Sequence, residues 1–131
     1  MKPDFTGEYV LDRNGSALGP AASAIMTARM SIAHDEPRFR CSARFASADD
    51  AMEFSFERST DGEVTTGPLL VSRCYWEGNT LVFEDPLQTG AAMAVMTWRY
   101  ELTAGGQRLR ATERIRGGGR DQDNVWEFER V

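Results

Sequence analysis

The sequence predicts an all-β protein, an antiparallel up-and-down β-barrel of about eight to ten strands. Apolar and polar residues alternate with a period of two through most of the chain, which is typical of strands with one buried face. Turn signals rich in glycine, proline or asparagine separate these runs, and no segment shows convincing helical periodicity. Tight and longer connections alternate along the chain, which favours a meander whose turns close one end and whose loops gather at the other.

The hairpin at residues 94–116 shows the alternation most clearly. Its first arm places Met96, Trp98 and Tyr100 on one face, and its second arm begins after the turn at 103–106. Glu113 breaks the rule, because it lies on the apolar side of the second arm.

The first half of the chain is expected to contain four strands. Residues 5–11 form the first, and a connection rich in Gly, Ser, Pro and Ala follows at 12–23, with room for one helical turn. The next three strands are expected at 24–33, 38–46 and 51–59. We expect His34 to be a solvent-exposed turn residue, because it stands in a turn signal that ends at Pro37.

The second half is expected to contain six shorter strands. They are placed at 63–66, 69–76, 80–84, 94–102, 109–116 and 124–131. The tight turns of the chain are expected at 34–37, 60–62, 77–79 and 103–106. The remaining connections are expected at 47–50, 67–68, 85–92 and 117–123.

Length and charge limit the possible functions. The 131 residues are expected to form a single domain over 1–131, and the net charge of −5 argues against nucleic acid or an anionic membrane as a partner. No run is long and apolar enough for a membrane span, and no secretion signal is expected, which predicts a cytoplasmic protein. Cys41 and Cys74 lie in alternating strands without metal-ligand spacing, so we expect buried free thiols, with no metal site and no cofactor.

Two stretches resemble a known group of barrels. The opening Phe5-Thr6-Gly7-Glu8-Tyr9 resembles the F-x-G-x-W start of fatty-acid-binding proteins and lipocalins, with Tyr9 in place of tryptophan. The last strand, from Trp126 to Val131, is similar to the closing strand of intracellular fatty-acid-binding proteins. The order of strands and turns also resembles small bacterial lipocalin-like proteins. The resemblance implies a calycin-type barrel around a cavity for a small apolar molecule.

The resemblance stops at two features. Fatty-acid-binding proteins hold the lipid carboxylate with an Arg-x-Tyr pair near the end of the chain, and the matching positions here are Trp126 and Phe128. They also carry a helical pair after the first strand, for which residues 12–23 are too short. The carboxylate clamp is therefore not carried over.

The inward positions are rich in methionine and aromatic residues, which form a bulky, polarizable and adaptable lining. Such a lining suits a hydrophobic ligand, although the same side chains could simply fill the barrel. A ligand would enter from the end that carries the long loops. The side chains expected to contact it are Met26, Phe45, Met52, Phe54, Met96, Trp98, Ile115 and Trp126.

Glu113 is the strongest single signal for chemistry. A carboxylate among apolar neighbours either pairs with a cation or is held near neutral by desolvation. Arg58 and Arg130 share the apolar side of their strands, and a structural ion pair with one of them is the expected state. Without such a partner, Glu113 could act as a general base.

Three functions follow from these observations. The leading hypothesis is a binding module that holds a small hydrophobic molecule inside the barrel. The alternative is a small barrel enzyme of the isomerase or cyclase type, in which Glu113 or Tyr100 moves a proton on an apolar substrate. A structural domain with a filled core is the third.

Overall fold

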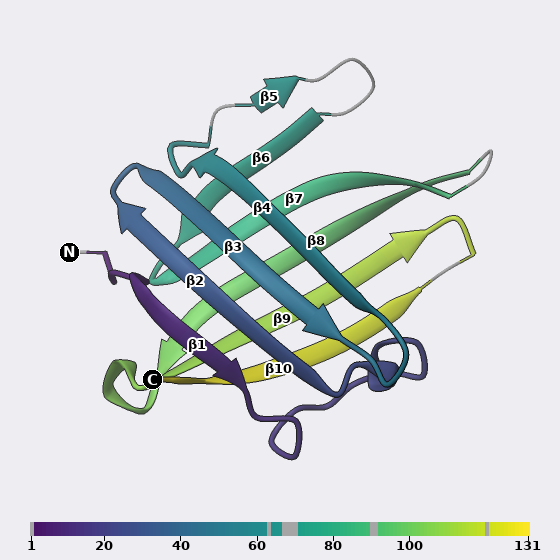
Figure 1. Cartoon of the computed structure of the whole chain (residues 1–131). Coiled ribbons are helices and arrows are strands. Elements are labelled where there is room, and N and C mark those ends of the chain that lie inside the picture. The colour runs from purple at the N-terminus through teal and green to yellow at the C-terminus, as the bar shows by residue number, and fades with distance from the viewer. Residues whose placement is uncertain (1, 63, 67–70, 90–91, 120) are drawn as a thin grey trace.

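The computed structural model is one antiparallel sheet that curls into a nearly closed barrel (Figure 1). It describes residues 2–62, 64–66, 71–89, 92–119 and 121–131. The strands are β1 (Gly7–Leu11), β2 (Thr27–Asp35), β3 (Arg38–Ala46), β4 (Ala51–Ser59), β5 (Val64–Thr66), β6 (Val71–Glu77), β7 (Thr80–Thr89), β8 (Ala92–Thr103), β9 (Arg108–Gly117) and β10 (Gln122–Arg130). Two 3-10 turns, Ala22–Ala24 and Ala104–Gly106, complete the described elements, and neither has the length or apolar content of a membrane-crossing helix.

The strands follow an up-and-down order. Consecutive strands pair with one another except β4 and β5, which stand at the two ends of the sheet, and β1 also pairs with β10, so the order is β4-β3-β2-β1-β10-β9-β8-β7-β6-β5. Because all pairs are antiparallel, the turns after β2, β4, β6 and β8 lie at one end, and the connections after β1 and β3 lie at the opposite end (Figure 1). The predicted fold class is confirmed. The predicted connection at 67–68 lies outside the described residues.

Burial follows the alternation in the sequence. Along β2 and β3 nearly every second side chain is buried and the others are exposed, so the arginines of β3 point to solvent. A one-residue slip would bury these arginines, which fixes the inward face of both strands. Tyr9, Phe39, Leu109 and Phe128 are among the fully buried side chains of the core.

The predicted loop at 85–92 is wrong. Strand β7 continues to Thr89 and pairs with β8 as far as Thr89↔Ala92. The strand runs through Pro86, which lies opposite Val95 of β8, although proline cannot donate a ladder hydrogen bond.

The prediction for His34 is also wrong. It belongs to β2, its side chain is 2% exposed, and its ring lies 5.5 Å from that of Phe39. The backbone N–H of Phe5 donates a hydrogen bond of 3.1 Å to Nδ1 of His34. Residues 5 and 6 were expected in the first strand but precede β1, and this bond is one of several that attach the segment before β1 to the barrel.

Two residues of the Phe5–Tyr9 motif, Phe5 and Tyr9, are hydrogen-bonded to each other in the core. The hydroxyl of Tyr9 donates a 2.7 Å hydrogen bond to the carbonyl of Phe5, and both side chains are fully buried. Arg130 donates a 2.6 Å bond from Nη2 to the Tyr9 hydroxyl, and its guanidinium lies 5.3 Å from the centre of the ring. This arrangement ties β10 to β1.

The barrel stays open along one seam. Strands β4 and β6 approach each other, but among the described residues no ladder joins β4 to β5 or β6. At the tight-turn end, the N–H of Gly62 donates to the carbonyl of Cys74 at 2.9 Å. This hydrogen bond from the β4–β5 turn therefore connects the two edges of the seam at this end.

Candidate functional site

A cavity of about 330 Å³ lies inside the barrel, between β2–β4 on one side and β7–β10 on the other. Most of its wall is apolar or aromatic, and three acidic or basic side chains, Arg58, Asp85 and Glu113, interrupt it. The remaining lining side chains are Met30, Phe45, Met52, Phe54, Phe56, Phe83, Met96, Trp98, Tyr100, Ala111 and Phe128. An enclosed apolar wall with a few polar groups is the usual form of a small-molecule site.

The inward side of β4 forms the exposed border of this cavity. Met52 and Phe54 pair with Phe45 and Ala43 of β3 and share their inward direction. They are nevertheless 58% and 40% exposed, whereas Phe56, further along the strand, is half-buried. Exposure on β4 therefore increases toward the loop at 47–50, at the end opposite the turns after β2, β4, β6 and β8.

The side chains expected to contact a ligand fall into two groups. Phe45, Met52, Phe54, Met96 and Trp98 line the cavity. The others are not part of its described wall: Met26 is 51% exposed just before β2, and Ile115 and Trp126 are buried in the packing beside it. The alternation of the sequence places all of them on the inner face, but the position of each residue along its strand determines whether its side chain lines the cavity.

Glu113 lies on the cavity wall, and the expected ion pair is wrong. Its Oε1 accepts hydrogen bonds from Nδ2 of Asn124 at 2.9 Å and from Nε1 of Trp126 at 3.2 Å. Asn124 is the direct partner of Glu113 in the β9–β10 ladder. Neutral donors on the neighbouring strand therefore hold the carboxylate, because Arg58 and Arg130 are bound elsewhere.

Arg58 pairs with Asp85 inside the cavity. Its Nη2 lies 3.4 Å from Oδ1 of Asp85 on β7, and its guanidinium lies 5.4 Å from the ring centre of Phe56. The two charged side chains are about one-quarter exposed. Sequence reasoning missed Asp85 because it assigned residues 85–92 to a loop, although Leu81, Phe83 and Asp85 continue one alternating face.

Tyr100 places its phenol on the same wall. Burial raises the pKa of Tyr100 well above its ordinary value, so the hydroxyl stays protonated at neutral pH. Its ring packs against Phe83 at 4.9 Å and Trp98 at 6.2 Å. Tyr100 can donate a hydrogen bond into the cavity, but it cannot accept a proton as a phenolate near neutral pH.

Cys41 and Cys74 are buried free thiols, as the sequence predicts. Desolvation raises the pKa of each thiol to about 12. A thiol with so high a pKa is a poor nucleophile, because the thiolate is the reactive form.

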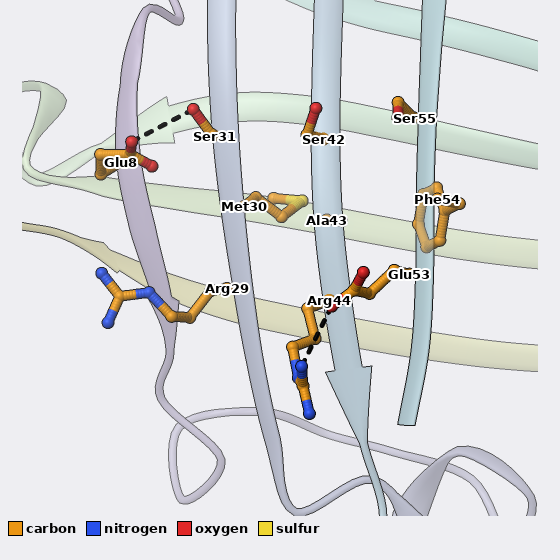
Figure 2. A pocket seen from close by; sticks show the side chains of 10 residues that line it. All are labelled: Glu8, Arg29, Met30, Ser31, Ser42, Ala43, Arg44, Glu53, Phe54 and Ser55. Atoms are coloured by element: carbon orange, nitrogen blue, oxygen red, sulfur yellow. Dashed lines mark hydrogen bonds and ion pairs between the residues drawn. The ribbon is translucent and has the colours of Figure 1, made fainter. Parts of the chain in front are cut away.

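A second pocket lies on the outer face of β1–β4 (Figure 2). Figure 2 shows Ser31, Ser42 and Ser55 in a row across β2, β3 and β4. Glu8 accepts a 3.1 Å bond from Ser31, and Arg44 pairs with Glu53 at 3.0 Å. These side chains are exposed and satisfy one another, so the pocket is part of the solvated surface rather than a candidate site.

Comparison with known proteins shows the fold. No protein-family model and no curated protein matches the chain. Wild-type fluorescent protein UnaG superposes with a TM-score of 0.65 at 13% identity, covering 97% of each chain. A mutant of the REP1-NXSQ fatty acid transporter gives 0.60 at 14% identity, covering 96% of this chain and 97% of the transporter. Fatty-acid-binding protein 1 of Echinococcus granulosus gives 0.59 at 13% identity, covering 97% of each.

These similarities extend over nearly the whole chain. The protein therefore has the calycin-type barrel fold of fatty-acid-binding proteins, as the resemblance in the sequence implies. The connection between β1 and β2 contains one 3-10 turn, Ala22–Ala24. The sequence predicted that this connection is too short for the helical pair of fatty-acid-binding proteins.

Proposed function

We propose that this barrel binds a small apolar molecule in its internal cavity. The observation that carries the proposal is the wall itself, since methionine and aromatic side chains surround about 330 Å³ of space. We assign ligand contact to Phe45, Met52, Phe54, Met96 and Trp98. The ligand enters beside Met52 and Phe54, the exposed inward residues of β4.

Two predictions from the sequence, a single domain and a cytoplasmic location, remain part of this proposal. One continuous sheet and one core cluster support a single lipocalin-like domain over residues 1–131. Two unpaired cysteines support a reducing compartment such as the cytoplasm, because disulfides are rare there.

Native mass spectrometry of the purified protein tests the binding function. We expect a co-purified small molecule, or, after its removal, enhancement of the fluorescence of the dye ANS that a hydrophobic ligand reverses. A protein that carries no extra mass and does not bind ANS would instead have a filled structural core.

A proton-transfer enzyme is the second candidate, because a carboxylate and a phenol share the cavity wall on adjacent strands. In this candidate Glu113 is the base and Tyr100 donates a hydrogen bond to the substrate. The test is incubation of the co-purified ligand with protein in deuterated water. Deuterium at a carbon of the ligand, lost in Glu113→Gln, supports an enzyme, and its absence with wild-type protein excludes this reaction.

A further inference from the structure

We propose that the polar group of the ligand is a protonated amine, bound by the carboxylate of Glu113 beside the rings of Trp98 and Tyr100. The proposal rests on the function proposed above, binding of an apolar molecule in the cavity, and it defines the chemical class of that molecule.

The carboxylate is held in a fixed position by neutral donors. Asn124 and Trp126 both donate to Oε1 of Glu113. Asn124 is itself 2% exposed, and its Oδ1 accepts a 2.7 Å bond from the backbone N–H of Gly19. The connection between β1 and β2 therefore fixes Asn124, and Asn124 fixes Glu113. Both contacts use one oxygen, and Oε2 has no hydrogen-bond partner among the described residues.

No cation of the described chain balances this carboxylate. Arg58, the cation on the cavity wall, pairs with Asp85, and Arg130 is hydrogen-bonded to Tyr9 and to the carbonyl of Asp4. The cavity wall thus carries one positive and two negative groups. A ligand with one positive charge near Glu113 restores neutrality in a site of low dielectric.

Aromatic rings lie where such a cation would sit. Trp98 is the direct cross-strand partner of Glu113 on β8, and its side chain lines the cavity. Tyr100 follows on the same strand and the same wall, with its ring edge-on to that of Trp98. The faces of such rings attract ammonium groups, and the attraction increases when the cation is desolvated.

The same charges disfavour an anionic ligand. A carboxylate near Glu113 would be repelled, and one near Arg58 would have to displace Asp85 from its ion pair. We therefore expect the head-group preference amine, then alcohol, then carboxylate. The apolar body of the ligand would extend toward Met52 and Phe54.

Three probes with the same alkyl chain test this order: dodecylamine, dodecanol and dodecanoate, each kept below its micelle concentration at neutral pH. Calorimetry or tryptophan fluorescence should show that dodecylamine binds the wild-type protein about 10- to 100-fold more tightly than dodecanol, as expected for a charge-assisted contact. This comparison uses no variant, so it does not depend on how any substitution folds.

Glu113→Gln then removes the charge and keeps the acceptor for Asn124 and Trp126. We expect it to remove the advantage of dodecylamine and to leave dodecanol binding unchanged. Glu53→Gln changes the net charge equally on the outer face and should not alter either affinity.

The outcomes separate the two proposals. If no probe binds, the proposed binding function fails. If dodecanol or dodecanoate binds at least as tightly as dodecylamine, or if Glu113→Gln and Glu53→Gln behave alike, the amine proposal is overturned and the binding function stands.

Discussion

Arg58 on β4 and Asp85 on β7 meet across the open seam of the barrel, with 3.4 Å between Nη2 and Oδ1. The two strands are not neighbours in the sheet. The pair therefore connects the part of β4 next to the β4–β5 turn to the opposite wall of the cavity. Met52 and Phe54, beside which a ligand is proposed to enter, lie toward the other end of β4.

This cross-seam pair should make a small and salt-sensitive contribution to stability. Both side chains are partly exposed and share a single long contact, so we expect a coupling free energy of about 0.5–1 kcal/mol. Urea unfolding of Arg58→Met, Asp85→Asn and the double variant measures it, at low and high salt. Additive effects of the two substitutions at low salt would show that the contact does not stabilise the barrel.

Asn124→Ala should destabilise the barrel substantially. The substitution leaves the N–H of Gly19 without its acceptor and removes a donor from Glu113. Loss of partners to buried polar groups costs about 1–3 kcal/mol in the free energy of unfolding. Ser42→Ala on the exposed face of β3 is the matched control and should change it by less than about 0.5 kcal/mol. Equal stabilities for the two variants would contradict the role given to Asn124.

Neither thiol should react in the folded protein. Cys41 and Cys74 are buried, and desolvation raises the pKa of each to about 12. At pH 8, Ellman's reagent should therefore label no cysteine within minutes and both after unfolding in guanidinium. Fast labelling of either thiol in native buffer would show that its surroundings are open.

The same thiols should make the stability of the protein fall as the pH becomes alkaline. Their folded pKa lies above the ordinary value of 9.0, so the folded state retains protons that the unfolded state releases. This stabilisation is complete below pH 9 and is lost as the pH rises toward 12. The free energy of unfolding of Cys41→Ala should consequently fall less between pH 9 and 11 than that of wild type. A parallel decrease in the two proteins would refute this.

Asp12 should titrate below its ordinary pKa of 3.8. Arg108 donates to Oδ2 at 2.7 Å, and the N–H of Gly15 donates to Oδ1, so both contacts lower the pKa of the carboxyl. Its contribution to stability is present above pH 3.8 and is lost as the pH falls through the lower folded value. An NMR titration should show the pKa of Asp12 rising toward 3.8 in Arg108→Gln. Arg110→Gln, whose wild-type arginine pairs with Glu127, should leave it unchanged.

The sequence by itself determined the strands and their inward faces. Alternation requires only local chemistry, because a shift by one residue would bury the arginines of β3 and expose Phe39. The same rule directed Glu113 inward and Cys41 and Cys74 into the core. It could not tell where β7 ends, since the strand continues past Asp85 and through Pro86, a residue that cannot donate a ladder hydrogen bond, as far as Thr89.

The tertiary structure decided which inward residues meet. Glu113 accepts hydrogen bonds from Asn124 and Trp126 rather than pairing with an arginine, because the β9–β10 register places Asn124 directly opposite it. Arg58 pairs with Asp85 because the curvature of the sheet brings β4 near β7, although the two strands are distant in the sheet order. His34 is buried because the segment before β1 folds back and donates to it from Phe5. These contacts depend on strand register, barrel closure and the course of the chain before β1, which local periodicity does not encode.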